Sequence, residues 1–222
     1  MQLIHAIFEP KGEGPHPTIV ALHGWGANGL DLLGLAPYLC AGRFLVICPQ
    51  GPVTTPIGAG AVGHGWYSLR MGAPPDIPAM LSAKRQLDEF IAGCFTRYPI
   101  DPRQLVVLGF SQGGAMAYQL ALSDPERFAA LVVLSSWLSE EVVDAIKPPA
   151  SCQKLPTLVQ HGSEDELVEV DRARKSVETL RGLRVPVTYR EYDMGHEIGP
   201  LSLRDLTAWL QEKIFSSIIA PG

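Results

Sequence analysis

Short runs of β-branched and aliphatic residues alternate along this chain with longer segments whose apolar residues recur every three or four positions. The strand-like runs are residues 3–8, 18–22, 44–48, 105–108, 130–134, 157–160 and 187–192. The helix-like segments are residues 79–98, 112–123, 166–182 and 200–214. Such alternation is typical of a mostly parallel sheet with helices on both faces. The central runs are continuously apolar, as expected for strands that are buried on both faces.

Length and composition narrow the classes of protein to which the chain could belong. With 46% hydrophobic and 18% charged residues in 222 positions, the chain can form a sizeable core, which excludes an intrinsically disordered protein. The length and the absence of a repeat or linker predict one domain over residues 1–222. A net charge of −5 without a basic run argues against a nucleic-acid partner.

The N-terminus and the cysteines favour a cytoplasmic protein. Residues 1–10 lack the basic region and the apolar stretch of a signal peptide. No apolar run reaches the length of about 18 residues that a membrane span needs, so stable membrane insertion is not expected. Four cysteines show neither a C-x-x-C pair nor a metal-binding spacing. We therefore expect reduced, mostly buried thiols at Cys40, Cys48, Cys94 and Cys152.

One segment interrupts the alternation of strands and helices. Residues 49–78 are rich in glycine and proline and carry scattered aromatic and aliphatic side chains. Connections of this length are uncommon and are usually functional. The alternative is an irregular surface excursion that its aromatic side chains attach to the core.

The motif Gly-Phe-Ser-Gln-Gly at residues 109–113 stands between an apolar strand and an amphipathic helix. In that setting G-x-S-x-G forms a nucleophile elbow, with the serine in a sharp, strained turn. Gly109 and Gly113 leave room where a Cβ atom would collide with neighbouring backbone. The motif therefore predicts Ser111 as a nucleophile, at a helix N-terminus that favours developing negative charge.

A serine hydroxyl needs a base, and on this kind of fold the acid and the histidine follow the serine along the chain. Only two histidines lie downstream of Ser111. His196 lies in a loop between the last strand and the last helix, from which an imidazole can reach the serine. His161 ends a strand, and we expect its side chain to pack beneath the following turn. His196 is therefore the favoured base.

The acid is expected on the loop that follows the strand at residues 157–160. Three carboxylates lie there, Glu164, Asp165 and Glu166. They could instead cap the helix predicted at 166–182, because acidic residues favour a helix N-terminus. Asp165 could do both and is the favoured partner of the imidazole. Asp193 is a rival acid, but its place three residues before the histidine is more typical of a turn former.

An oxyanion hole requires two preorganised N–H donors. One is expected from Gln112, immediately after the nucleophile. The second is expected from the glycine-rich loop at residues 23–29, and we favour the Trp25 N–H. The alternative is that His23 and Gly24 form only a tight strand exit with a buried histidine.

Together these motifs resemble the phospholipase/carboxylesterase family of α/β-hydrolases, which includes the acyl-protein thioesterases. The matching segments are residues 22–26, 109–114, 161–168 and 194–197, and they span nearly the whole chain. The resemblance implies an α/β-hydrolase fold, with a mostly parallel central sheet, helices on both faces and no separate cap domain. It implies hydrolysis of carboxylic esters or thioesters of small molecules, without a metal or organic cofactor.

The resemblance also implies residue roles. It makes Ser111, Asp165 and His196 the catalytic triad, and it makes the amides of Trp25 and Gln112 the oxyanion hole. Two positions depart from the family pattern without touching the triad. Where the thioesterases typically have Asp and Pro, this chain has Ser163 and Glu166.

An acyl pocket is implied along residues 64–69, within the long segment at 49–78. The candidate pocket residues are Trp66, Tyr67, Leu69 and Met71. The same side chains could instead hold the segment against the core. The segment differs in detail from the family, which leaves the acyl-chain preference open. Members of the family often form homodimers, but the sequence identifies no interface.

The expected function is that of a serine carboxylesterase acting on short- to medium-chain acyl esters. The alternative within the family is an acyl-protein thioesterase or lysophospholipase that acts on long-chain acyl substrates. A prolyl-oligopeptidase-like peptidase uses a similar turn, but such enzymes carry a gating domain for which 222 residues leave no room. Dienelactone hydrolases have cysteine where Ser111 stands. A non-catalytic binding module would have no use for three triad residues.

Overall fold

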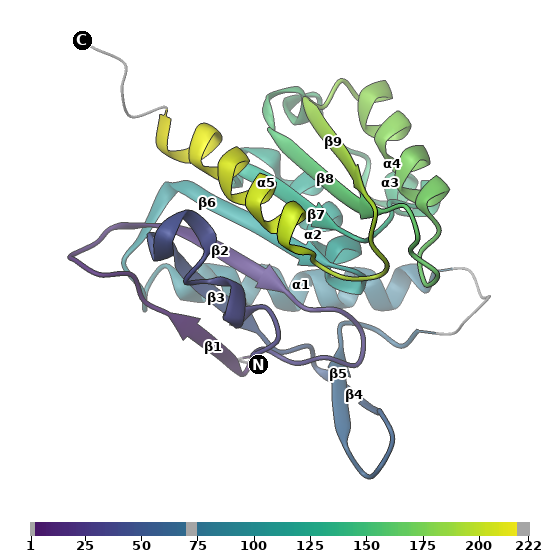
Figure 1. Ribbon diagram of the computed structural model, residues 1–222, viewed down its shortest axis with the longest axis horizontal. Helices are drawn as coiled ribbons and strands as arrows, with labels where there is room; N and C mark the ends of the chain where they lie inside the picture. Colours follow the sequence, from purple (N-terminus) through teal and green to yellow (C-terminus); the bar gives the residue numbers. More distant parts are fainter. Residues whose placement is uncertain (1–2, 70–74, 217–222) are drawn as a thin grey trace.

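The computed structural model describes residues 3–69 and 75–216. Its centre is a sheet with the strand order β1-β3-β2-β6-β7-β8-β9, in which β1 is antiparallel to β3 and the other pairs are parallel. The strands are β1 (His5–Phe8), β2 (His16–Leu22), β3 (Leu45–Pro49), β6 (Ile100–Phe110), β7 (Ala130–Leu134), β8 (Thr157–Gly162) and β9 (Val187–Tyr192). Figure 1 shows this twisted sheet between helices.

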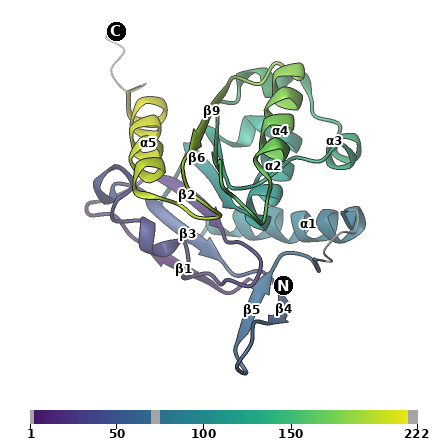
Figure 2. The same ribbon diagram turned by 45° about the vertical axis from the view of Figure 1, so that its right-hand side comes forward.

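Helices cover both faces of the sheet. They are α1 (Ile77–Cys94), α2 (Gln112–Ser123), α3 (Glu140–Ile146), α4 (Val170–Gly182) and α5 (Pro200–Leu210), which continues as a π-helical turn (Gln211–Phe215). Short 3₁₀ turns lie at Leu33–Leu35, Leu39–Gly42, Pro125–Arg127 and Ala150–Lys154. Helices α1 to α4 pack on one face, whereas α5 and the first two 3₁₀ turns pack on the other (Figures 1 and 2).

Side chains of the central strands alternate between two buried clusters, one on each face of the sheet. In β6, Leu105 and Val107 point toward α1 and α2, whereas Val106 and Leu108 point toward α5. All four are fully buried, because a strand in the middle of a two-sided sheet has no solvent-facing side. This burial explains the unbroken apolar runs of the sequence and confirms the predicted mostly parallel sheet.

Several predicted boundaries shift in the structure. The strand at 130–134, the strand at 187–192 and the helix at 112–123 match their predicted limits, whereas β6 is much longer than residues 105–108. Helix α1 begins at Ile77 rather than 79 and ends at Cys94 rather than 98. Its start is fixed by Asp76, whose side chain accepts a hydrogen bond from the Ala79 N–H at 3.0 Å.

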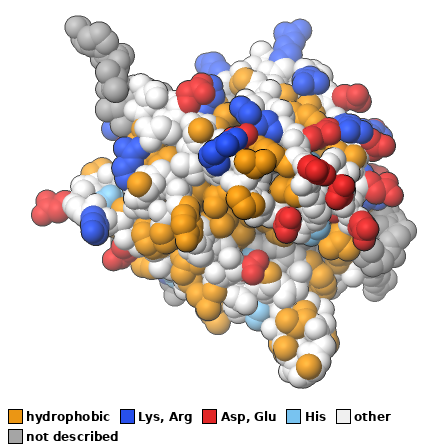
Figure 3. All heavy atoms as spheres, in the orientation of Figure 1, with side chains coloured by type: hydrophobic (Ala, Val, Ile, Leu, Met, Phe, Trp, Pro, Cys, Tyr) orange, Lys and Arg blue, Asp and Glu red, His pale blue; other side chains and the backbone are white. Residues whose placement is uncertain are grey.

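The segment at 49–78 is more regular than its composition predicts. It contains an antiparallel hairpin, β4 (Val53–Pro56) and β5 (Val62–Gly65), which projects from the molecule in Figure 2. Its glycines allow close backbone contacts: a Cβ atom on Gly63 would lie 2.0 Å from the carbonyl oxygen of Gly26. Hydrophobic side chains gather on the projecting part in Figure 3, where Ile57 and Val62 are exposed.

The four cysteines are free and buried, in agreement with the prediction of reduced thiols. Within residues 3–69 and 75–216, every helix is too short or too polar to span a lipid bilayer.

Candidate active site

The candidate site residues lie at the edge of the sheet where the parallel strands end. Residue 111 follows β6 directly, residue 165 follows β8, and the loop at 23–29 follows β2. Ligands of open parallel sheets bind at this edge, because the loops that follow the strands converge there. The topology therefore brings together three segments that are far apart in the sequence.

Ser111 occupies a strained turn between β6 and α2. Its backbone angles are φ 53° and ψ −120°, a region that residues with a Cβ atom rarely adopt. The turn is held by the Ser111 N–H, which donates to the carbonyl oxygen of Leu134 at 2.9 Å. Tight packing requires the flanking glycines: a Cβ atom on Gly109 would lie 2.2 Å from the Gly113 oxygen. One on Gly113 would lie 2.0 Å from the Leu22 oxygen.

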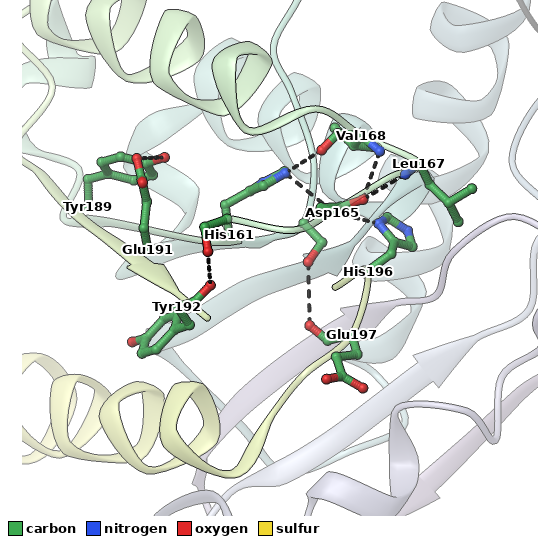
Figure 4. Close-up of polar contacts among 11 residues, drawn as sticks. His161, Asp165, Leu167, Val168, Tyr189, Glu191, Tyr192, His196 and Glu197 are labelled. Carbon is green, nitrogen blue, oxygen red and sulfur yellow. Dashed lines mark hydrogen bonds and ion pairs between the residues drawn. The ribbon is translucent and has the colours of Figure 1, made fainter. Parts of the chain in front are cut away.

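The carboxylate of Asp165 is fully buried and contacts the imidazole of His196. Nδ1 of His196 lies 2.7 Å from Oδ2 of Asp165, a contact drawn as a dashed line in Figure 4. Oδ1 of Asp165 accepts hydrogen bonds from the N–H groups of Leu167, at 3.0 Å, and Val168, at 2.8 Å. The carboxylate is therefore held in place by the backbone while one oxygen remains for the histidine.

The loop after β8 differs from its predicted form. Helix α4 begins at Val170 rather than at 166, and its N-cap is Glu169. The interpretation that Asp165 caps this helix is therefore wrong. Asp165 instead closes a turn at 165–168, because its side chain accepts hydrogen bonds from the Leu167 and Val168 N–H groups two to three residues before the helix begins at Val170.

His196 packs beside the nucleophile elbow. Its ring lies 4.9 Å, between centroids, from that of Phe110, the residue that precedes Ser111. The imidazole is only slightly exposed, with 14% of its side chain accessible. Within the described parts of the chain, His196 forms no hydrogen bond or ion pair with the rival acid Asp193. Asp165 is the carboxylate that the structure places against this ring.

His161 lies on the other side of the Asp165 carboxylate (Figure 4). Its Nε2 atom is 2.7 Å from the carbonyl oxygen of Val168 and 3.4 Å from Oδ2 of Asp165. The side chain is completely buried, and this burial lowers the pKa of His161 below its usual value. The ring therefore supports the turn at 165–168, which agrees with the prediction that it packs beneath that turn.

Two backbone N–H groups are available near Ser111. Gln112 is the first residue of α2, so its N–H has no carbonyl one turn earlier in the helix. None of the described residues accepts a hydrogen bond from the Trp25 N–H. The loop of Trp25 adjoins the elbow, because a Cβ atom on Gly24 would lie 3.3 Å from Cβ of Ser111. Both predicted donors thus lie in segments that adjoin Ser111.

The side chain of Gln112 has a structural role that the sequence analysis missed. Its Oε1 atom accepts a hydrogen bond from the Trp66 N–H at 2.9 Å, and its Nε2 donates to the Tyr67 carbonyl at 2.8 Å. The amide is buried and joins the elbow to the segment after β5. The available signal was a long polar side chain at the start of a helix whose next residues are small or apolar.

The four candidate pocket residues do not lie in similar environments. Trp66 and Tyr67 are buried in the core cluster, whereas Leu69 is exposed. Burial raises the pKa of the Tyr67 phenol to about 12. Tyr67 also lines a narrow pocket with residues of α1, α2 and α3. Met71 lies outside the described residues.

The described residues include no group of three or more His, Cys, Asp and Glu side chains placed to hold a metal ion.

Comparison with other sequences identifies one family over almost the entire chain. The sequence profile of the family described as phospholipase/carboxylesterase matches residues 4–214. An acyl-protein thioesterase 1 of Gibberella zeae is 36% identical, but that match spans only 52% of this chain and 50% of the relative. An acyl-protein thioesterase 1 of Cryptococcus neoformans var. neoformans is 28% identical over 96% of this chain and 98% of the relative.

Solved structures resemble the chain over nearly its whole length. The crystal structure of esterase PE8 has a TM-score of 0.83 and 25% identity, covering 96% of this chain and 100% of that chain. A Bacillus cereus carboxylesterase has a TM-score of 0.81 at 18% identity, covering 95% and 94%, a likeness that concerns the fold alone. These likenesses confirm the expected α/β-hydrolase fold.

Proposed function

The chain belongs to the phospholipase/carboxylesterase family, and we propose that it is a serine hydrolase that cleaves carboxylic esters through an acyl-enzyme on Ser111. The family is hydrolytic, which gives the reaction class. The observation that carries the assignment to residues is the buried Asp165 carboxylate, 2.7 Å from Nδ1 of His196. A buried acid so placed fixes the imidazole tautomer and leaves Nε2 free to accept a proton from a serine.

The proposed reaction has two steps, acylation of Ser111 and hydrolysis of the acyl-enzyme. In the first, the Ser111 oxygen attacks the acyl carbonyl as its proton moves to Nε2 of His196, and the alcohol leaves with that proton. In the second, a water molecule gives its proton to His196 and attacks the acyl-enzyme, releasing the carboxylic acid and restoring the serine hydroxyl. Asp165 stays ionised throughout and stabilises the imidazolium.

The tetrahedral intermediate carries a negative oxygen, for which we propose the N–H groups of Trp25 and Gln112 as donors. Their location beside Ser111 and the position of Gln112 at the N-terminus of α2 support this role. Preorganised donors of this kind contribute about 3–4 kcal/mol each to transition-state stabilisation. No step of the proposed mechanism uses a cofactor.

The proposed substrates are small-molecule esters with short- to medium-chain acyl groups. Thioesters with longer acyl chains are the second candidate, because a relative named acyl-protein thioesterase 1 aligns with 96% of this chain. We further infer a cytoplasmic protein, which the four buried free thiols support. We also propose that the protein can form a homodimer, because members of the family often do so.

The decisive experiment measures hydrolysis of p-nitrophenyl esters from acetyl to palmitoyl, with Ser111→Ala as the blank. The proposal expects rates that peak at short or medium chains and disappear in the blank. A peak at long chains would contradict the short- to medium-chain assignment and favour the long-chain alternative, to be measured next on acyl thioesters and lysophospholipids. Equal rates for wild type and Ser111→Ala would overturn the Ser111 mechanism.

A further inference from the structure

His23 is a buried histidine that the proposed mechanism does not use. Its Nε2 atom lies 3.0 Å from the backbone nitrogen of Gly51, and its Nδ1 atom lies 2.7 Å from the carbonyl oxygen of Gly24. A backbone N–H can only donate and a carbonyl oxygen can only accept. These two partners therefore require a neutral imidazole with its proton on Nδ1.

Burial favours the same neutral form. The side chain is almost completely inaccessible, and this burial lowers the pKa of His23 below its usual value. The ring lies against that of Trp66, with centroids 5.1 Å apart. Trp66 also donates its indole N–H to the backbone oxygen of His23 at 2.9 Å. The imidazole is thus fixed on both of its nitrogens and on one face.

The bond from His23 to Gly24 acts on the peptide group that joins Gly24 to Trp25. In a trans peptide the C=O and N–H groups lie in one plane and point in opposite directions. The Gly24 oxygen accepts hydrogen bonds from Nδ1 of His23 and, at 3.3 Å, from the Ala27 N–H. Fixing this oxygen therefore fixes the direction of the Trp25 N–H. No described residue accepts a hydrogen bond from that N–H.

We propose that His23 is a positioning residue of the oxyanion hole, which holds the Gly24–Trp25 peptide so that the Trp25 N–H faces the oxygen of the reacting acyl group. This inference rests on the proposed function, because it takes Trp25 as an oxyanion donor. His23 does not touch substrate. It acts through the peptide group, and its effect is confined to the transition state, where the oxygen becomes negative.

Two variants separate the bond to Gly24 from the bond to Gly51. The side-chain amide of Asn stands as far from the backbone as Nδ1 of histidine, so His23→Asn can still donate to the Gly24 oxygen. The amide of Gln stands as far out as Nε2, so His23→Gln can accept from Gly51 but does not hold Gly24. Each variant keeps one hydrogen bond and loses the ring, so the two variants should lose similar amounts of stability and form a matched pair.

The experiment measures kcat, KM and melting temperature of both variants with p-nitrophenyl butyrate. We expect kcat of His23→Gln to be at least about tenfold below that of His23→Asn, since losing a whole oxyanion donor lowers kcat by about 10²–10³. KM should differ little, because the ground-state carbonyl uses the donor weakly. Equal kcat values, or a difference confined to KM, would overturn the inference.

Two further measurements keep the outcome interpretable. The rates of hydrolysis by wild type and by Ser111→Ala test the proposed function itself, which fails if the two rates are equal. If the rate depends on Ser111 but the two His23 variants have equal kcat values, only the role of His23 is rejected. If neither variant folds, ¹⁵N-histidine NMR of the wild type decides. A neutral Nδ1–H signal for His23 that shifts when an arylboronic acid adds to Ser111 supports the inference. An Nε2–H tautomer or no shift overturns it.

Discussion

The carboxylate of Asp165 is shared between the backbone and His196. One oxygen accepts from two N–H groups of its own turn, and the other lies 2.7 Å from Nδ1 of His196. The backbone bonds determine where the carboxylate points, and the carboxylate in turn determines where the imidazole points. The orientation of the proposed base therefore depends on a turn of only four residues.

Replacing Asp165 with Asn tests this arrangement. The Asn oxygen can keep both backbone bonds, while its NH₂ group faces Nδ1 of His196 and favours the tautomer that cannot accept the serine proton. We expect kcat to fall by about 10³–10⁴ with the fold intact. Steady-state kinetics and circular dichroism check this outcome, and a rate within tenfold of wild type would reject Asp165 as the acid.

The two downstream histidines should respond differently to substitution. His161→Phe removes the bond to the Val168 oxygen in a fully buried position, so the free energy of unfolding should fall by about 1–3 kcal/mol. His196→Ala removes the proposed base, so kcat should fall much further with less effect on stability. Urea denaturation and ester hydrolysis of both variants provide the comparison. The reverse pattern would assign the base to His161.

Two glutamines of α2 provide a matched pair for the buried amide of Gln112. Gln112→Met removes two hydrogen bonds, to Trp66 and Tyr67, and leaves their backbone groups without that partner. Gln119 is equally buried, but neither polar atom of its side-chain amide has a partner among the described residues. Gln112→Met should therefore lower the free energy of unfolding by about 1–3 kcal/mol, whereas Gln119→Met should be neutral or stabilising. Equal losses would mean that the Gln112 amide contributes nothing specific.

A methyl group at Gly65 should disturb the loop that carries Trp25. Its Cβ atom would lie 2.1 Å from Cε3 of the Trp25 ring, so the two segments must separate. We expect Gly65→Ala to lower both kcat and melting temperature. Gly182→Ala is the control, because a Cβ atom there meets nothing within 4 Å. An active, fully stable Gly65→Ala enzyme would show that the Trp25 ring can move without consequence.

The parts of this protein that the sequence predicts are those whose cause is local. Continuous apolar runs mark β7 and residues 105–108 of β6, because each of these residues is buried between the helices on both faces of the sheet. The motif of the elbow at Ser111 is also local, since Gly109 and Gly113 lie two residues on either side, although the backbone that requires Gly113 is that of the distant Leu22. The fold and the strained turn at Ser111 therefore follow from pattern and spacing.

The parts that escaped prediction depend on contacts between distant residues. The glycines of β5 read as loop residues, yet Gly63 is required by its contact with Gly26, 37 positions earlier (63 − 26). The Gln112 amide joins residues 46 and 45 positions away. Helix α4 begins later than the predicted residue 166, because the two N–H groups that Asp165 binds belong to a turn that precedes the helix. No local pattern reports such partners.

The buried histidines should make the protein less stable in mild acid. Burial lowers the pKa of His161 in the folded state, whereas an unfolded histidine keeps a pKa of about 6.5. Between these values the unfolded chain binds a proton that the folded chain does not, so stability rises with pH. The contribution of His161 is therefore fully present above about pH 6.5 and is lost as the pH falls toward its folded pKa.

Urea midpoints at pH 7.5, 6.5 and 5.5 measure this effect, with His161→Phe as the reference. The wild type should lose stability across this range, and the variant should lose less, because it has no imidazole to protonate at that position. His23, whose pKa burial also lowers, stays in both proteins and contributes equally to both curves. Parallel curves would mean that His161 binds its proton equally well in the folded and unfolded chains, which its complete burial argues against.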